Sequence, residues 1–266
     1  MSEWLPGAEV VKDHSWGLVG TTVLELLHDG NRYVVKAGDD GDGHIARELE
    51  AHHAWVKPWT TLSRAPELVH GDEAAKLIVT RYLPGELVVG TRHEQEPDIY
   101  RQAGVLLAQL HGQLAIDDDF EPAENQKALY WLDQPHQIPP VIADHLRTTI
   151  KSWPTSPSVL VPTHGDWQPR NWLIHRGTVS VIDFGRAALR PAYTDFGRLA
   201  VQQFRANPAL ETAFLDGYGT DPRDPATWHR HRIRDAIGTA CWAHRVRAKD
   251  FEQQGLRMLT EALDSP

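Results

Sequence analysis

The sequence predicts an α+β fold of two lobes: a β-rich N-terminal lobe with one helix, and a mainly α-helical C-terminal lobe. Short apolar runs separated by turn residues fill the first 83 residues and are typical of strands. Helical periodicity prevails after Pro84-Gly85, where the character of the chain changes. We therefore expect an N-terminal lobe of residues 1–83 and a C-terminal lobe of residues 84–266, because 266 residues suffice for one such two-lobed unit.

The composition excludes several classes of protein. The net charge of −9 argues against a general nucleic-acid binder. No apolar run reaches the roughly 18 residues of a membrane-spanning helix, and the N-terminus lacks the basic and apolar segments of a signal peptide. The single cysteine, Cys241, permits no intrachain disulfide. We expect a cytoplasmic protein, a monomer or homodimer, that binds neither nucleic acid nor membranes.

The N-terminal lobe is expected to contain a hairpin, a helix and two more strands. Asp29-Gly30 separates two apolar runs, and this dipeptide is typical of a tight hairpin turn. Helical spacing of apolar residues follows, and we expect Pro58 to end that helix. The expected strands are residues 19–27, 32–35, 67–70 and 76–80, and the expected helix is residues 44–57.

The C-terminal lobe is expected to be helical on both sides of a short strand-rich segment around residues 159–186. Residues 117–122, Asp-Asp-Asp-Phe-Glu-Pro, are expected to form an acidic loop. A long apolar stripe near the C-terminus could be broken at Gly238 or at Asp250. The expected helices are residues 98–114, 141–153, 194–206, 209–218 and 226–262.

Three oxygen-bearing side chains follow short apolar runs in the strand-rich segment. Asn171 lies five residues after Asp166, and Asp183 lies a further twelve residues on. Because loops join the ends of strands, we expect all three at one edge of a small sheet. Mg²⁺ prefers oxygen ligands, and a carboxylate that does not bind the metal can orient or deprotonate a hydroxyl. This combination is typical of phosphoryl transfer, although a single Asp in a turn is usually structural.

The segments around these residues resemble a known family. Residues 164–171, His-Gly-Asp-Trp-Gln-Pro-Arg-Asn, are similar to the catalytic loop of the aminoglycoside phosphotransferase and choline kinase family. Residues 182–186, Ile-Asp-Phe-Gly-Arg, look like its metal-binding turn, and residues 191–198 resemble the segment that commonly follows. Since this family shares the protein-kinase fold, the resemblance implies a protein-kinase-like architecture over nearly the whole chain.

The resemblance also implies roles for individual residues. Asp166 would accept or orient the substrate hydroxyl, while Asn171 and Asp183 would hold Mg²⁺ against the nucleotide phosphates. Lys36, which ends the second strand of the hairpin, would contact the α and β phosphates and pair with a helix carboxylate. Glu48 is the expected partner, and Glu50 is the alternative because helix register is uncertain by a residue or two.

Two further segments are expected at the nucleotide. The loop from Ser15 to Thr22 contains Gly17 and Gly20, and the hydroxyls of Ser15, Thr21 and Thr22 could bind phosphate. Residues 81–83 are placed like an adenine-binding connector, which binds the base through backbone groups. Their side chains therefore say little about the choice of nucleotide: ATP is expected, and GTP remains an alternative. These three residues are Arg81, Tyr82 and Leu83.

The catalytic-loop segment departs from the common family pattern at three positions. Gln168 is neutral where protein kinases carry a lysine near the transferred phosphate, so another cation could act there. Arg170 or Arg186 could supply it. We expect Arg186 to be that catalytic cation, because a salt bridge that shapes the loop is favoured for Arg170. Trp167 could stack on a substrate ring, but a position in the core is favoured for it.

The sequence leaves the acceptor open. No acidic cluster accompanies the motifs, so a polycationic aminoglycoside is not favoured over a sugar, nucleoside or amino alcohol, and antibiotic resistance is not favoured over metabolism. A catalytically silent nucleotide-binding module is the alternative, disfavoured because Lys36, Asp166, Asn171 and Asp183 are all present. A protein kinase is disfavoured because the stretch from Asp183 to Asp195 is too short for a long activation segment.

Overall fold

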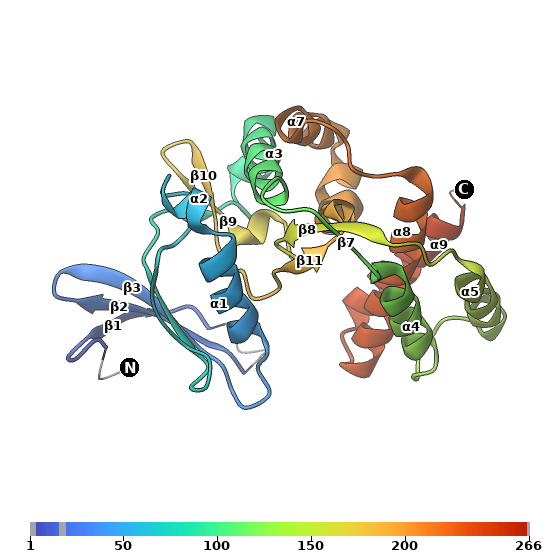
Figure 1. Cartoon of the computed structure of the whole chain (residues 1–266), viewed down its shortest axis with the longest axis horizontal. Coiled ribbons are helices and arrows are strands. Elements are labelled where there is room, and N and C mark those ends of the chain that lie inside the picture. Colours follow the sequence, from blue (N-terminus) through green and yellow to red (C-terminus); the bar gives the residue numbers. More distant parts are fainter. Residues whose placement is uncertain (1–3, 16–19, 265–266) are drawn as a thin grey trace.

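The computed structural model describes residues 4–15 and 20–264 and has two lobes (Figure 1). The N-terminal lobe is built on a five-stranded antiparallel sheet of order β1-β2-β3-β5-β4. Helices α1 (His44–Ala54) and α2 (Lys57–Thr60) connect β3 to β4. The strands are β1 (Glu9–Asp13), β2 (Thr22–His28), β3 (Asn31–Ala37), β4 (Leu68–Asp72) and β5 (Leu77–Arg81).

The predicted hairpin is confirmed as β2 and β3. His28 pairs with Asn31, which leaves Asp29 and Gly30 as a two-residue turn. Both turn residues have positive φ, 48° and 75°, as the tight turn that matches strand twist requires. This register places Lys36 opposite Val23, near the end of β3.

The predicted helix at residues 44–57 is shorter than expected. It ends at Ala54, and Pro58 lies inside a second short helix, α2, instead of ending the first. The prediction failed because proline is well tolerated in the first turn of a helix, where its missing N–H has no intrahelical partner. The turn between the two helices directs Trp59 into the interior, where it is fully buried.

The C-terminal lobe contains helices around two three-stranded sheets, of order β10-β9-β6 and β11-β8-β7. Its strands are β6 (Glu86–Leu87), β7 (Ile116–Asp118), β8 (Ser158–Thr163), β9 (Trp172–His175), β10 (Thr178–Val181) and β11 (Ala188–Arg190). Its α-helices are α3 (Pro97–His111), α4 (Phe120–Leu132), α5 (Pro140–Ser152), α6 (Gly197–Leu199), α7 (Pro208–Tyr218), α8 (Pro225–Arg245) and α9 (Lys249–Asp264). Its 3₁₀ or π segments are η1 (Arg92–Gln95), η2 (Pro169–Asn171), η3 (Ala192–Phe196) and η4 (Ala200–Phe204).

Two predictions for this lobe are corrected. The expected acidic loop is strand β7 followed by the start of α4, in which Glu121 is buried against Arg234 instead of facing solvent. The long C-terminal stripe breaks after Arg245, not at Gly238 or Asp250. Arg247 there has φ of 60°, a conformation that ends a helix in the manner of a left-handed cap.

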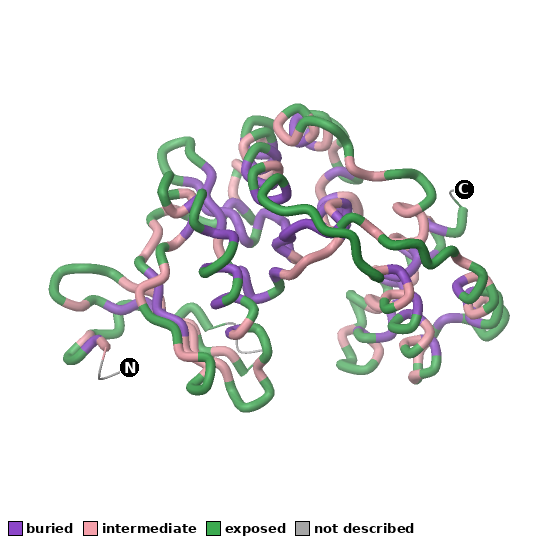
Figure 2. Tube along the Cα trace, viewed as in Figure 1, coloured by how far each residue is buried: buried purple, intermediate pink, exposed green. Residues whose placement is uncertain are grey.

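The largest apolar core joins the two lobes. Ala51, Trp55 and Trp59 pack in one buried cluster with side chains from α3, β9, β10 and α7. Buried segments are accordingly concentrated where α1, α3 and the short strands meet, while the tip of the β2–β3 hairpin is exposed (Figure 2). The helix that carries Glu48 is therefore fixed against the strands that flank the motif residues. The predicted boundary between the lobes, at residues 83 and 84, stays a prediction.

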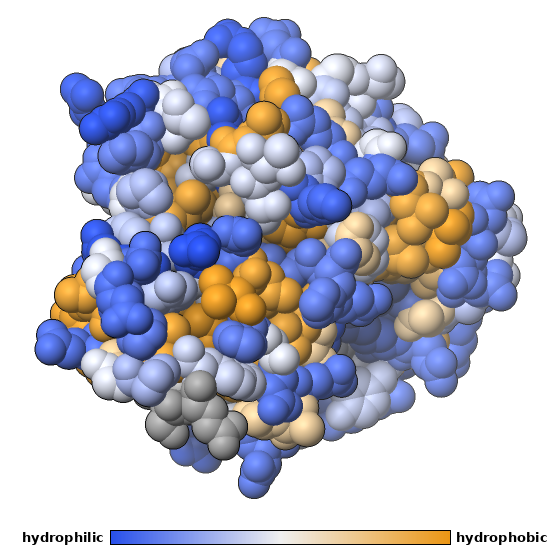
Figure 3. All heavy atoms as spheres, turned by 60° about the vertical axis from the view of Figure 1, so that its left-hand side comes forward, coloured by the Kyte–Doolittle hydropathy of each residue, from blue (hydrophilic) through white to orange (hydrophobic). Residues whose placement is uncertain are grey.

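Viewed from the side of the N-terminal lobe, the surface shows hydrophobic patches between hydrophilic side chains (Figure 3). Val10 and Val11 of edge strand β1 are among the exposed apolar residues. Within residues 4–15 and 20–264, no helix has the length and apolar character needed to cross a membrane.

Candidate active site

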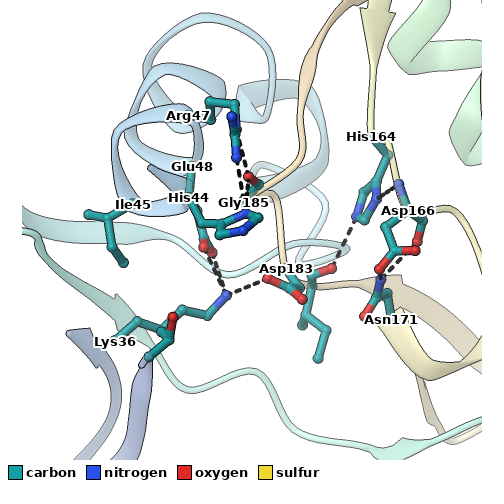
Figure 4. A network of polar contacts seen from close by, with 12 residues as sticks. Lys36, His44, Ile45, Arg47, Glu48, His164, Asp166, Asn171, Asp183 and Gly185 are labelled. Carbon is teal, nitrogen blue, oxygen red and sulfur yellow. Dashed lines mark hydrogen bonds and ion pairs between the residues drawn. The ribbon is translucent and has the colours of Figure 1, made fainter. Parts of the chain in front are cut away.

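The motif residues lie in loops that connect the two small sheets. Residues 164–171 leave β8 and enter β9, and Asp183 follows β10 before the chain reaches β11. Because β9 pairs with β10 and β8 pairs with β11, the two loops lie next to each other. The N–H of Ile182 donates to the carbonyl of Asn171 at 3.0 Å. Asp166, Asn171 and Asp183 are thus brought together as predicted, but in loops between two small sheets and not at the edge of a single one (Figure 4).

Asn171 is oriented by Asp166. Its Nδ2 donates to the backbone carbonyl of Asp166 at 2.8 Å and lies 3.2 Å from Oδ2 of the same residue. Both residues are almost fully buried. With its nitrogen directed at Asp166, the amide of Asn171 presents its oxygen in the opposite direction, as an acceptor.

Lys36 joins the two lobes at the site. Its Nζ lies 2.8 Å from both carboxylate oxygens of Glu48 and 2.9 Å from Oδ1 of Asp183. The alternative partner, Glu50, is exposed on the other side of α1. Burial disfavours the ammonium, but the carboxylates of Asp183 and Glu48 outweigh it and raise the pKa of Lys36 above its ordinary value. Lys36 in turn holds the pKa of Asp183 well below its usual range.

Unusual backbone conformations bring the two loops together. Asp183 has φ of 70° and Gly165 has φ of 77°, in the left-handed region that Asp tolerates better than most residues. A Cβ on Gly165 would lie 2.2 Å from the carbonyl oxygen of Arg186. Glycine is therefore needed at residue 165, and its absence of a side chain allows Arg186 to approach the loop that carries Asp166.

Helix α1 contacts the turn after Asp183 directly. The carbonyl of Gly185 lies 2.8 Å from Nδ1 of His44 and accepts from Nε of Arg47 at 2.9 Å. These bonds run between the helix that carries Glu48 and the turn that carries Asp183, as Figure 4 shows. They fix the two carboxylates on either side of Lys36.

The buried carboxylate of Asp195 holds the start of the loop of residues 164–171. Its two oxygens accept from the backbone N–H groups of His164 at 2.7 Å and Gly165 at 2.6 Å. His111 contributes a third contact at 3.2 Å. Burial alone would raise the pKa of Asp195, but the bonds from His111 and His164 outweigh it and keep the pKa low. The side chain of His164 contacts the backbone, with Nε2 3.1 Å from the carbonyl oxygen of Ile182.

We expect Asp195→Asn to destabilise this loop. An amide offers only one acceptor oxygen, so one of the two backbone N–H groups would face a donor in a buried place. The free energy of unfolding should fall by about 2 kcal/mol, measured by denaturant unfolding, and turnover should fall with it. Exposed Asp216 on α7 provides the control: if Asp195→Asn were as stable as Asp216→Asn, the supporting role would be wrong.

The carboxylate of Asp166 is surrounded by donors. Gln168 donates to Oδ1, Arg170 donates to Oδ2 at 2.5 Å, and Nε of Arg198 lies 3.8 Å from Oδ1. Burial would raise the pKa of Asp166, but Arg170, Arg186 and Arg198 together lower it below the ordinary value. Asp166 is therefore an ionised group held in place from several sides. Trp167 is fully buried and contacts Trp59 and Trp172, so the favoured core position is found.

The predicted nucleotide loop is described only at its ends, because Gly17 lies outside the described residues. The hydroxyl of Ser15 accepts from the N–H of Val23 at 3.0 Å, and the hydroxyl of Thr21 donates to Asp42 at 2.7 Å. Thr22 begins β2 opposite Ala37. Thr22 thus lies opposite the residue after Lys36, while the hydroxyls of Ser15 and Thr21 are engaged by Val23 and Asp42. The contact of these three residues with phosphate stays a prediction.

The predicted connector begins within β5, because Arg81 is the last residue of that strand, and Tyr82 and Leu83 follow it. The N–H groups of Arg81 and Tyr82 are already used, since they donate to the carbonyls of Glu67 at 2.8 Å and Arg32 at 3.0 Å. Among the residues that the structure describes, the N–H of Leu83 has no backbone partner. Of the three predicted residues, Leu83 thus has a backbone donor to offer to a base.

Sequence reasoning did not single out Arg198, Arg47 or His44. Arg198 lies in the segment that follows the motifs, and its position three residues after Asp195 was the available signal. Arg47 and His44 act through the backbone of Gly185, and such a pairing between distant segments has no sequence signal. A cavity of about 340 Å³ lies elsewhere in the C-terminal lobe, among α6, α8 and α9, and none of the residues that line it belongs to the loop of residues 164–171.

The donor set fits a magnesium ion. Asp183 is half exposed and has one oxygen on Lys36, which leaves its second oxygen, and Asn171 presents its amide oxygen. Mg²⁺ usually takes one or two carboxylates and completes its octahedron with waters and substrate phosphates. Asn171 and Asp183 would be the protein ligands of such an ion.

The fold and the lysine–carboxylate arrangement define a protein-kinase-like phosphotransferase. A model of the phosphotransferase enzyme family matches residues 14–234, and the chain belongs to that family. Choline kinase LicA from Streptococcus pneumoniae has 14% identity and a TM-score of 0.69, covering 100% of this chain and 96% of its own. A thermostable mutant of aminoglycoside phosphotransferase APH(4)-Ia, in ternary complex with AMP-PNP and hygromycin B, has 14% identity and a TM-score of 0.70, covering 99% and 96%.

A third solved structure is similar over most of its length. The apoenzyme of macrolide 2'-phosphotransferase MphH from Brachybacterium faecium has 16% identity and a TM-score of 0.61, covering 95% of this chain and 93% of its own. These likenesses confirm the predicted protein-kinase-like fold. A search of curated proteins finds no match.

Proposed function

We propose that this enzyme transfers the γ-phosphate of ATP, with GTP as the alternative donor, to a hydroxyl group of a small molecule. The observation that carries the proposal is the meeting of Lys36, Glu48 and Asp183 within 3 Å at Nζ of Lys36, beside the hydrogen-bonded pair of Asp166 and Asn171. In protein kinases, the lysine–glutamate ion pair and the metal-binding aspartate must both be in place for activity. The alternative, a silent nucleotide-binding module, would not need Asp166.

Each group has a part in the reaction. The acceptor oxygen bonds to the γ-phosphorus as the bond to the β,γ-bridging oxygen breaks, and ADP leaves with that electron pair. Asp166 orients the hydroxyl and accepts its proton. Lys36 binds the nucleotide phosphates. Asn171 and Asp183 would hold Mg²⁺, which would supply positive charge to neutralise the phosphates. Arg186 places a positive charge near the transferred phosphoryl group. In protein kinases a lysine provides this charge, and Gln168 stands at its position in this chain.

Three findings support a small-molecule acceptor over a peptide. The solved structures that are similar to this chain include a choline kinase and an aminoglycoside phosphotransferase in complex with hygromycin B. The family model extends over most of the chain. Only β11 and the short segment η3 lie between Asp183 and Phe196, which leaves little chain for docking a peptide. A role in antibiotic resistance and a role in metabolism both fit this reaction.

The proposal is tested by acceptor-dependent release of ADP or GDP. The full chain is incubated with each nucleotide, Mg²⁺ and a panel of aminoglycosides, sugars, nucleosides and amino alcohols. We expect turnover with a subset of acceptors and its loss when EDTA removes Mg²⁺ or when Asp183 is replaced by Asn. Nucleotide binding without turnover for any acceptor would favour the silent module.

We expect Arg186→Ala to reduce turnover more than nucleotide affinity. The side chain of Arg186 is close enough to Asp166 to lower the pKa of that carboxyl, and it makes no hydrogen bond with a described residue, so it can stabilise charge that develops during transfer. Loss of one such donor typically costs on the order of 100-fold in kcat. Steady-state kinetics with Arg257→Ala, an exposed residue of α9, as control would measure this, and an unchanged kcat would remove Arg186 from the mechanism.

A further inference from the structure

Three guanidinium groups converge on the one carboxylate of Asp166. Nη2 of Arg170 lies 2.5 Å from Oδ2, and Nε of Arg198 lies 3.8 Å from Oδ1. Arg186 is also close enough for its charge to act on Asp166. Three positive charges therefore face a single negative charge at the place where the acceptor hydroxyl must lie.

The other carboxylates of the site do not balance this charge. Asp183 is engaged by Lys36 at 2.9 Å, and Asp195 is buried behind the loop with its oxygens on two backbone N–H groups. The guanidinium groups also affect one another. Burial lowers the pKa of Arg186, the carboxylate of Asp166 raises it, and the positive charges of Arg198 and Arg170 lower it. Among the residues that the structure describes, these carboxylates thus leave a surplus of positive charge on the acceptor side.

The nucleotide does not account for all three cations. Lys36 and a magnesium ion would serve its phosphates, and Arg186 is assigned above to the transferred phosphoryl group. Arg198 comes from α6, in the helical part of the C-terminal lobe. It makes no hydrogen bond within the described part of the chain, its distance of 3.8 Å from Asp166 is too long for one, and its side chain is 29% exposed. Its N–H groups are available to a ligand.

We propose that the acceptor carries an anionic group, a carboxylate or a phosphate, and that Arg198 with Arg170 binds this group while the hydroxyl faces Asp166. This inference rests on the proposed phosphotransferase reaction and specifies its substrate class. A guanidinium binds carboxylate and phosphate through two parallel N–H bonds. A cationic acceptor such as an aminoglycoside or choline would bring further positive charge to three guanidinium groups, and such a juxtaposition opposes binding.

The first test compares acceptors that differ mainly in charge. Turnover of the full chain with Mg²⁺ and ATP is measured for a library of hydroxylated compounds in matched sets, for example gluconate, a glucose phosphate, glucose and glucosamine. We expect the highest kcat/KM for an anionic member, and the carboxylate and phosphate members distinguish the two sources of charge. A best acceptor that is neutral or cationic would overturn the proposal.

Arg198→Gln separates substrate binding from positioning of Asp166. With the best acceptor, its KM should rise about tenfold or more, as expected for loss of a charge-assisted hydrogen bond, while the KM for ATP stays within about a factor of two of wild type. Because Arg198 also acts on Asp166, kcat should fall as well, but by a smaller factor than the acceptor KM rises. Arg198→Lys should recover part of the loss, and Arg101→Gln, at an exposed position of α3, serves as control. A lower kcat with unchanged acceptor KM would mean that Arg198 only positions Asp166, and the proposal would be wrong.

If no acceptor is phosphorylated, that result counts against the proposed phosphotransferase function. A binding measurement then tests the anionic substrate class separately. The enzyme saturated with Mg²⁺ and ADP is titrated calorimetrically with glycerate, glycerol phosphate, glycerol and aminopropanediol. Saturable binding of either anionic compound, weakened in Arg198→Gln and kept in Arg101→Gln, supports the inference. Equal binding of all four, preferred binding of a neutral or cationic compound, or no binding of the anionic compounds contradicts it.

Discussion

Asp166→Asn should abolish nearly all phosphoryl transfer while leaving nucleotide binding intact. The substitution preserves the shape of the side chain but removes the charge that orients the acceptor hydroxyl and accepts its proton. General-base catalysis typically contributes 10²–10⁴-fold, so we expect kcat to fall by about 10³-fold with little change in the KM for ATP. Steady-state kinetics with the best acceptor of the panel measures both quantities.

The control for this substitution is Asp144→Asn, at an exposed position on α5. It removes the same charge from the chain without touching the site, and its kinetics should match those of the wild type. Circular dichroism and thermal unfolding would show that Asp166→Asn is folded. Transfer that persists at more than about a tenth of the wild-type rate in Asp166→Asn would exclude the assigned role.

Lys36→Met should affect both activity and stability. The nucleotide loses its cation, so turnover should become undetectable or fall at least about 100-fold. Glu48 is only 5% exposed in its side chain and would be left without its cation. Removing one partner of a buried ion pair typically destabilises a protein by about 3–5 kcal/mol, which denaturant unfolding would show as a clear fall in the free energy of unfolding.

A double substitution separates the two effects. Lys36→Met with Glu48→Leu removes both buried charges, and apolar residues often replace such a pair without loss of stability. We expect this variant to regain most of the free energy of unfolding and to remain inactive. The matched control is Lys127→Met, whose exposed pair with Glu124 on α4 should contribute no more than about 1 kcal/mol. A stable and active Lys36→Met enzyme would contradict the account.

The fold could be predicted from local signals where those signals are strong. Asp29-Gly30 specified its hairpin because only a two-residue turn with positive φ fits between the strands. The prediction from Pro58 was wrong because the effect of a proline depends on whether it lies in the first turn of a helix or further inside. Pro58 lies in the first turn of α2, and the burial of Trp59 sets the position of that helix. Glu121 misled because its acidic neighbours suggested a loop, whereas its charge is neutralised inside the lobe by Arg234.

The sequence predicted which motif residues lie together in the site. It did not predict which charged side chains surround Asp166. Asp166, Asn171 and Asp183 have a spacing that identifies them, and Lys36 lies opposite Glu48 in space although twelve residues separate them in sequence. The convergence of Arg198 on Asp166 depends on how α6 packs against the loop, and no spacing rule contains that information. The substrate class that we infer from these guanidinium groups was therefore not accessible from the sequence alone.

The most direct test of the central claim follows the phosphoryl group itself. ATP with an isotopically labelled γ-phosphate is incubated with Mg²⁺, the best acceptor and either wild-type enzyme or Asp166→Asn, and the products are identified by mass spectrometry. We predict that the wild type forms an acceptor with the complete labelled phosphoryl group on a hydroxyl, and that Asp166→Asn does not form this product. Label found only in inorganic phosphate, or equal labelling of the acceptor by both enzymes, would contradict it.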